Sequence, residues 1–137
     1  MAQPTGIISA DGGRLDASLG TVLAAGNVAL GAGWGAGTVA ITEGSNDQAG
    51  VLTVTAVTGG GLAQATATIT VTFADGAYLF APVVLATVTS TSSIDEGHVV
   101  ATSTTTGFVL TFSVLPVTTK LYRFTYAVIG KKAGATT

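Results

Sequence analysis

Apolar and polar side chains alternate with a period of two residues along most of the chain after residue 38. The clearest case is residues 65–73, where apolar side chains alternate with threonines. That period is typical of a strand with one buried face. Its apolar set is Ala67, Ile69, Val71 and Phe73. Short alternating or apolar runs predict six further strands, over residues 38–42, 51–58, 83–89, 99–103, 108–113 and 121–129.

Turn residues separate these runs at close spacing, as in Asp75-Gly76 and the three glycines 59–61. No long helical pattern lies between them, so parallel pairing through crossover helices is excluded. The pattern predicts an all-β fold, either an antiparallel β-sandwich or a jelly-roll-like barrel of about seven strands. We expect this β domain to cover residues 38–130, with 131–137 as a short flexible tail.

The first 37 residues follow a different pattern and are expected to form an extended N-terminal arm. Glycines and Pro4 interrupt residues 1–14. Residues 15–30 place leucines near helical spacing, yet Gly20 and Gly26 weaken a helix, so a short helix and an extended arm both remain open. Residues 31–37 form a glycine-rich loop around Trp34, which either fills this chain's own core or inserts into a partner.

Composition changes this picture at the surface. Only 9% of the 137 residues are charged, against roughly 25% in an average domain. The outward positions of the predicted strands are mainly Thr, Ser and Ala, whose burial costs little side-chain entropy or desolvation. Such a face favours contact with another protein chain, and a symmetric homo-oligomer is the simplest way to cover it.

Several classes of function are disfavoured by the same counts. Five basic residues and a net charge of −2 argue against nucleic acid. With no cysteine and one histidine, disulfides, thiolate zinc sites and multi-histidine sites are excluded. Residues 17–42 carry no charge but contain six glycines, which argues against a membrane span. The N-terminus lacks a basic segment before an apolar run, so we expect no signal peptide and synthesis in the cytoplasm.

No pattern indicates catalysis, a metal or a cofactor. Residues 95–98 (Asp-Glu-Gly-His) bring carboxylates and the histidine together, but a solvated turn explains them better. Glu43, Asn46 and Asp47 could offer oxygen ligands to calcium, but the loop pattern is absent and turn formation is the better interpretation. Neither a G-x-S-x-G elbow nor a phosphate-binding loop is present. We therefore expect a protein that is not an enzyme.

The strands resemble a known group of modules. The run SNDQAGVLTVT at residues 45–55 is similar to the "T-D-x-A-G-x-I-T-V-T" signature of β-rich modules in tailed-bacteriophage virion proteins. Further similar pieces follow in the same order, at residues 67–73, 81–85, 102–108 and 122–129. Such modules occur in capsid decoration proteins, head fibres and tail-fibre ends, often as trimers. The resemblance implies a structural role in the virion and transfers no catalytic residue.

The leading interpretation is a capsid decoration (cement) protein, located on the capsid surface. It would bind the major capsid protein, as a homotrimer, and stabilise the shell. The arm would supply apolar contacts. The candidate contact residues are Ile7, Ile8, Leu15, Leu19, Val22, Leu23 and Trp34.

Two other interpretations stay open. A receptor- or carbohydrate-binding module of a tail or head fibre predicts exposed aromatic rings, with Trp34, Tyr78 or Tyr122 stacking on sugars. A bacterial adhesin domain of immunoglobulin-like type fits the strands but not the expected lack of a signal peptide. Threonines at 66–72 are too few and too local for an ice-binding surface.

Overall fold

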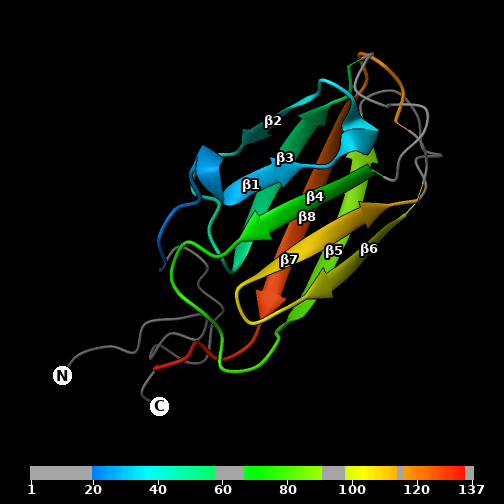
Figure 1. Ribbon diagram of the computed structural model, residues 1–137. Helices are drawn as coiled ribbons and strands as arrows, with labels where there is room; N and C mark the ends of the chain where they lie inside the picture. Colours follow the sequence, from blue (N-terminus) through cyan, green and yellow to red (C-terminus); the bar gives the residue numbers. More distant parts are fainter. Residues whose placement is uncertain (1–19, 58–66, 91–97, 114–115, 135–137) are drawn as a thin grey trace.

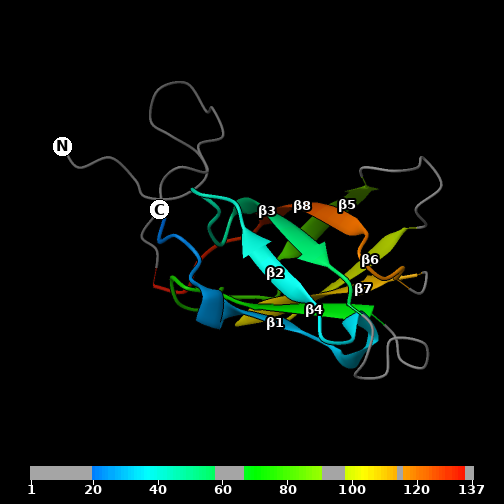
Figure 2. The same cartoon turned by 90° about the horizontal axis from the view of Figure 1, so that it is seen from above.

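Eight strands form two four-stranded antiparallel sheets that pack face to face as a β-sandwich (Figures 1 and 2). The computed structural model describes residues 20–57, 67–90, 98–113 and 116–134. The first sheet has the order β1 (Val28–Leu30), β4 (Ala67–Thr72), β7 (Gly107–Phe112), β6 (Val99–Ser103). The second has the order β2 (Thr38–Ile41), β3 (Ala49–Thr55), β8 (Leu121–Ile129), β5 (Val83–Ser90).

The all-β expectation is confirmed, in its sandwich form. All seven predicted strands are present, with ends that shift by a few residues; β3, for example, begins at Ala49 rather than at residue 51. β2 and β3 form one hairpin and β6 and β7 another. The remaining connections pass from one sheet to the other (Figure 2). The chain therefore ties the two layers together repeatedly.

An eighth strand lies where the sequence suggested a helix or an arm. After a single 3-10 turn at Ala25–Asn27, β1 pairs with β4 in the register Val28↔Val71 to Leu30↔Ile69. Residues 28–37 thus belong to the sandwich rather than to an arm that ends at residue 37. Residues 1–19, on which the rest of the expected arm falls, lie outside the described residues.

The beginning of the expected tail is also attached to the sandwich. Lys132 forms an antiparallel bridge with Tyr78, and the Leu79 N–H donates to the Lys131 carbonyl at 2.8 Å. Residues 131–134 therefore continue the backbone pairing beyond the end of β8 and are not a separate tail.

The core lies between the sheets and is built from the inward positions of the alternation. In β4 the apolar set faces inward and the threonines face outward; in β8 the buried positions alternate with exposed ones in the same way. Trp34 is fully buried and lies 5.9 Å from Phe112, 5.6 Å from Tyr122 and 5.7 Å from Phe124, between ring centroids. Its indole N–H donates to the Thr68 carbonyl at 3.0 Å. Trp34 thus fills this chain's own core.

Candidate functional site

The residues expected to contact a partner do not gather into one surface. Ile7, Ile8, Leu15 and Leu19 lie outside the described residues. Leu23 and Trp34 are core residues, 4% and 0% exposed, and cannot meet a partner without unfolding. Val22 is 54% exposed and forms an isolated bridge with Asn46. The described part of the chain therefore leaves only Val22 of this set at the surface.

A buried polar cluster, Ser45-Asn46-Asp47-Gln48, lies at the end of the sandwich where β3 begins. The Asp47 carboxylate accepts the Ala74 N–H at 2.6 Å and the Asp75 N–H at 2.8 Å. It also forms an ion pair with the Lys132 ammonium at 2.7 Å. Because two backbone donors and one cation surround it, the charge of Asp47 is matched within the chain.

Lys132 is held by more than this ion pair. Its ammonium donates to the Gly76 carbonyl at 2.9 Å and lies 4.3 Å from the ring centroid of Tyr78 and 4.8 Å from that of Phe73. Cation–π attraction adds to the ion pair where water is partly excluded. The cluster thus joins the β2–β3 loop, the loop after β4 and the segment after β8.

Backbone groups of the β2–β3 loop are satisfied by the same cluster. The Asn46 side-chain oxygen accepts the N–H groups of Gln48 and Ala49, at 2.8 and 3.2 Å. The Tyr126 hydroxyl donates to the Asn46 carbonyl at 2.6 Å. A side chain at Gly50 would collide with the Tyr126 hydroxyl and with Ser45, so the close approach requires glycine.

Burial and the nearby Asp47 charge raise the pKa values of two tyrosines in this region. The pKa of Tyr78 rises to about 12, with desolvation as the largest cause. The pKa of Tyr126 rises well above its usual range for the same reasons. Both phenols therefore stay neutral in the folded protein at ordinary pH.

Two of the three residues considered above as oxygen ligands, Asn46 and Asp47, are engaged by partners within the chain. The Glu43 side chain is exposed, whereas Asp47 is buried and fully engaged. Within the described ranges, no group of three or more His, Cys, Asp or Glu residues is placed to hold a metal ion. Asp95 and Glu96 fall outside those ranges, and His98 at their border is exposed.

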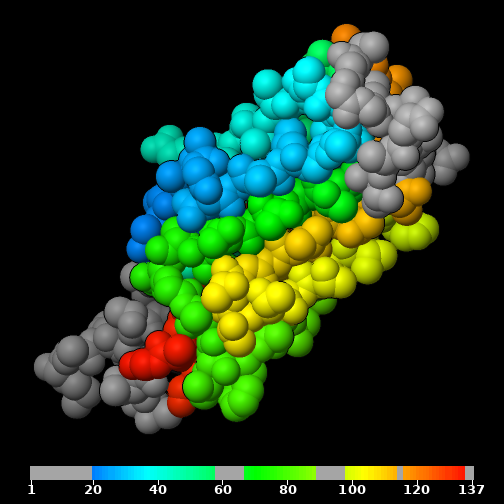
Figure 3. Space-filling view, in the orientation of Figure 1, coloured from blue at the N-terminus to red at the C-terminus, as the bar shows by residue number. Residues whose placement is uncertain are grey.

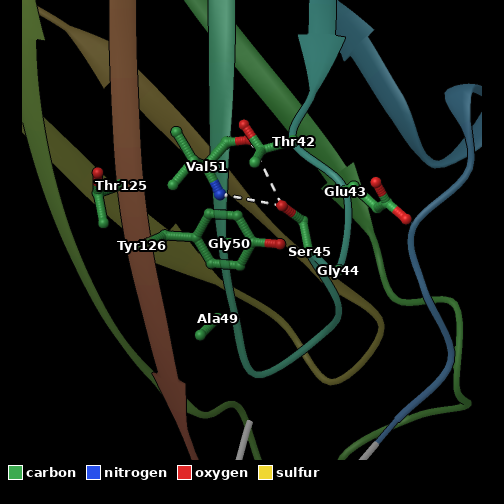
Figure 4. Close-up of a pocket in the computed structure, with 9 residues that line it drawn as sticks. All are labelled: Thr42, Glu43, Gly44, Ser45, Ala49, Gly50, Val51, Thr125 and Tyr126. Atoms are coloured by element: carbon green, nitrogen blue, oxygen red, sulfur yellow. Dashed lines mark hydrogen bonds between the residues drawn. The ribbon is translucent and has the colours of Figure 1, made fainter. Parts of the chain in front are cut away.

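A shallow depression of about 420 Å³ lies beside the β2–β3 hairpin (Figure 4). Backbone and small side chains form most of its lining, with the Glu43 carboxylate at its rim and the Tyr126 ring below Gly50. The Ser45 hydroxyl accepts the Val51 N–H at 3.1 Å. No histidine or cysteine is among the residues that line it, so the depression offers no nucleophile–base pair. Its lining residues are Thr42, Glu43, Gly44, Ser45, Ala49, Gly50, Val51, Thr125 and Tyr126.

The outer face of the second sheet carries the more informative feature, an exposed apolar patch. The register places Val83 opposite Ile129 and Leu85 opposite Ala127, so these four side chains share the outward face. We call them the β5–β8 patch. Val83 is 60% exposed, Leu85 58% and Ile129 53%. Leu79 and Phe80, exposed in the loop that leads into β5, extend the apolar surface along the chain.

The rest of this outer face is nearly uncharged. The structure describes the burial of most outward side chains of β2, β3, β5 and β8. Among those described, Arg123 is the only charged one. The others are small or hydroxyl-bearing, apart from Val51 and Leu121. They are Thr38, Ala40, Ala49, Val51, Thr53, Thr55, Thr87, Leu121 and Thr125.

The first sheet presents a different outer face, toward the viewer in Figure 3. It is dominated by threonines, and Val100, 55% exposed, is its one exposed large apolar side chain among the described strand residues. We call this the threonine face. It consists of Ala29, Thr68, Thr70, Thr72, Val100, Thr102, Val109 and Thr111.

Sequence reasoning identified Ser45–Asp47 as turn residues but missed that they are buried. Four consecutive polar residues are typical of a solvated loop. Their burial is explained by partners that are distant in sequence, at Ala74, Lys132 and Tyr126.

Comparison with protein-family models, curated proteins and solved structures finds no match to this chain. In the part of the chain that the structure describes, no helix is long and apolar enough to cross a membrane.

Proposed function

We propose that this chain is a structural virion protein of a tailed bacteriophage, of the capsid-decoration type. It binds the major capsid protein on the capsid surface, as a homotrimer, and stabilises the shell. The proposal rests on the sequence resemblance together with one observation, the exposed apolar β5–β8 patch on an otherwise nearly uncharged face.

The resembling pieces correspond to a continuous part of the sandwich. They fall on β3, β4, the start of β5, the β6–β7 hairpin and β8. The pieces thus cover β3, β4 and most of β8, and only the first two residues of β7.

The described chain begins and ends at one end of the sandwich, which suits attachment there. Thr21 approaches the Asp75 carboxylate at 3.4 Å, and Lys132 reaches the neighbouring Gly76 carbonyl. The polar cluster fixes this end to the core. An attached module could therefore transmit load from the segments outside residues 20–134 to the whole sandwich.

Such a protein works by contact area and not by chemistry. An interface of roughly 1,000 Å² contributes about 25 kcal/mol of gross burial free energy, of which association costs consume a large share. Repetition over many copies makes even a modest net energy per copy effective in resisting internal pressure.

The direct test is immunogold labelling of virus particles from the source lysate, with antibody raised against the recombinant protein. Gold distributed evenly over heads supports decoration. Gold confined to tail tips contradicts decoration and supports a receptor-binding appendage. Particles without gold remove the virion proposal altogether.

The carbohydrate-binding alternative gains no specific support. Its candidate stacking residues, Trp34, Tyr78 and Tyr122, are 0%, 2% and 2% exposed. Buried rings of this kind cannot stack on a sugar without opening the core.

The expected arm now corresponds to residues 1–19, and its role can be tested by deletion. Residue 23 must be kept, because Leu23 is buried and its N–H donates to the Ser45 carbonyl at 2.8 Å. Removal of residues 1–19 should leave the thermal unfolding of the sandwich nearly unchanged and abolish co-sedimentation with capsids. Full capsid binding by the truncated protein would contradict a contact role for the arm.

A further inference from the structure

We infer that the outer face of the second sheet is a self-association surface, on which a second copy of this chain packs against the β5–β8 patch. This deepens the proposed function, which rests on assembled copies, by assigning the face that joins them. It can be tested without any capsid.

The patch is unusual because its exposed side chains are adjacent and because it lies beside the edge of a sheet. Val83 and Leu85 lie next to Ile129 and Ala127 on adjacent strands, so the exposed aliphatic groups are contiguous. β5 is an edge strand of eight residues. Long apolar edge strands are normally shielded by lysine, by proline or by cover. Pro82 precedes β5 and β6 of the first sheet lies beside it, so the outward face of β5, and not its edge, is what remains open to a partner. Contiguous exposed apolar surface at such a place marks an interaction site.

The charge pattern selects the kind of partner. Nucleic acid or a strongly charged protein surface would meet one charge, Arg123, on this outer face. A second copy presents a surface of the same neutral, apolar character. The exposed Glu43 lines the same depression as Val51 and Thr125, and it supplies the opposite charge that Arg123 of a neighbouring copy could meet.

The area of the face approaches that of a standard interface. Its strands β2, β3, β8 and β5 have four, seven, nine and eight residues. At about 3.4 Å per residue and about 4.8 Å between strands, the flat footprint is roughly 460 Å². The relief of the side chains raises the accessible area toward the about 800 Å² per partner of a standard interface.

The threonine face provides the contrast that makes the assignment specific. Most of its outward side chains are threonines, which can hydrogen-bond to water. Among the described strand residues of that sheet, Val100 is the one exposed large apolar side chain. Leu85 and Val100 are nearly equally exposed, at 58% and 55%, and both lie on edge strands. They form a matched pair for substitution.

The experiment is sedimentation velocity on the full chain, from about 1 to about 200 µM, for wild type, Leu85→Glu and Val100→Glu. We expect wild type to form a discrete oligomer. We expect Leu85→Glu to raise the dissociation constant by about a hundredfold or more, because it buries an unpaired charge among the aliphatic side chains of the β5–β8 patch. Val100→Glu should sediment as wild type does.

Three results would overturn the inference: wild type that is monomeric throughout the range, Leu85→Glu that associates like wild type, or both variants weakened equally. Should Leu85→Glu fail to fold by circular dichroism, Leu85→Thr replaces it, because threonine favours strands and is tolerated on the opposite face. We expect that variant to weaken association about tenfold.

The two proposals fail separately. A monomeric wild type contradicts the self-association surface and the homotrimer, whereas the gold labelling alone decides the virion location. Loss of association in the Leu85 variants combined with unlabelled particles contradicts the virion role and leaves the self-association surface standing.

Discussion

The molecule buries polar residues at one place and exposes apolar residues at another. Ser45, Asn46 and Asp47 are 3%, 1% and 2% exposed, whereas Val83 and Leu85 are 60% and 58% exposed. Each buried polar residue named here has partners within the chain, but the exposed aliphatic side chains lack cover from the described part of the same chain. The comparison suggests that the first region serves the fold and that contacts with other chains belong to the second.

The two regions should therefore respond oppositely to substitution. Changes in the polar cluster should lower the free energy of unfolding, because they leave buried groups without partners. Changes in the β5–β8 patch should leave unfolding nearly unchanged and alter association instead.

The largest expected effect is that of Asp47→Ala. It removes the acceptor of the Ala74 and Asp75 N–H groups and the counter-charge of the Lys132 ammonium. We expect a loss of about 3–5 kcal/mol in the free energy of unfolding, measured by urea denaturation. The matched control is Glu43→Ala, an exposed carboxylate four residues earlier, which should change it by less than about 0.5 kcal/mol. Equal effects of the two substitutions would contradict the role assigned to the cluster.

Alkaline pH should weaken the same region. The unfolded chain loses its tyrosine protons near pH 10, whereas folded Tyr78 keeps its proton up to a pKa of about 12. Stability is therefore fully present below pH 10 and falls between pH 10 and 12. The expected slope is about 1.4 kcal/mol per pH unit for each tyrosine that titrates only when unfolded. Urea denaturation at several pH values measures it, and a flat profile up to pH 12 would contradict the raised pKa values.

A smaller difference in the free energy of unfolding is expected between substitutions of two buried tyrosines. Tyr126→Phe removes the hydrogen bond to the Asn46 carbonyl and should cost about 1 kcal/mol. Tyr78→Phe removes a buried hydroxyl that has no hydrogen-bond partner among the described residues, and should be neutral or slightly stabilising. Chemical denaturation of the two variants side by side measures the two free energies of unfolding. A greater loss for Tyr78→Phe would contradict the conclusion that the Tyr126 hydroxyl, and not the Tyr78 hydroxyl, stabilises the fold.

The smallest effect on unfolding is expected in the β5–β8 patch. Leu85→Thr exchanges one exposed strand residue for another and should change the free energy of unfolding of the monomer by less than about 0.5 kcal/mol. The measurement is urea denaturation at a concentration where the protein is monomeric. A loss of 2 kcal/mol or more would show that Leu85 supports the fold itself.

The period of two along the chain was sufficient to predict the strands. It placed seven of them and paired the correct side chains on each face, since alternation depends only on local geometry. It could not say which face is buried, because threonine fits either environment. β1 was missed because three residues, Val28–Leu30, are too few to show a period, and their pairing with β4 is not local.

The site was harder to predict than the fold, because its contacts join distant residues. Asp47 and Lys132 are 85 residues apart, and nothing in either neighbourhood indicates the other. Trp34 was correctly singled out as an anchor, but only the packing against Phe112, Tyr122 and Phe124 shows that the anchor is internal. The β5–β8 patch arises from the register of β5 with β8, which the sequence does not specify.

Carbene footprinting of the wild-type protein across a dilution series tests the central claim most directly, since it labels exposed side chains in the protein as it stands. We predict that Val83, Leu85 and Ile129 become protected as the concentration rises, while labelling of Val100 stays constant. Constant labelling of all four residues would show that the patch remains in water, and would contradict its role as a contact surface.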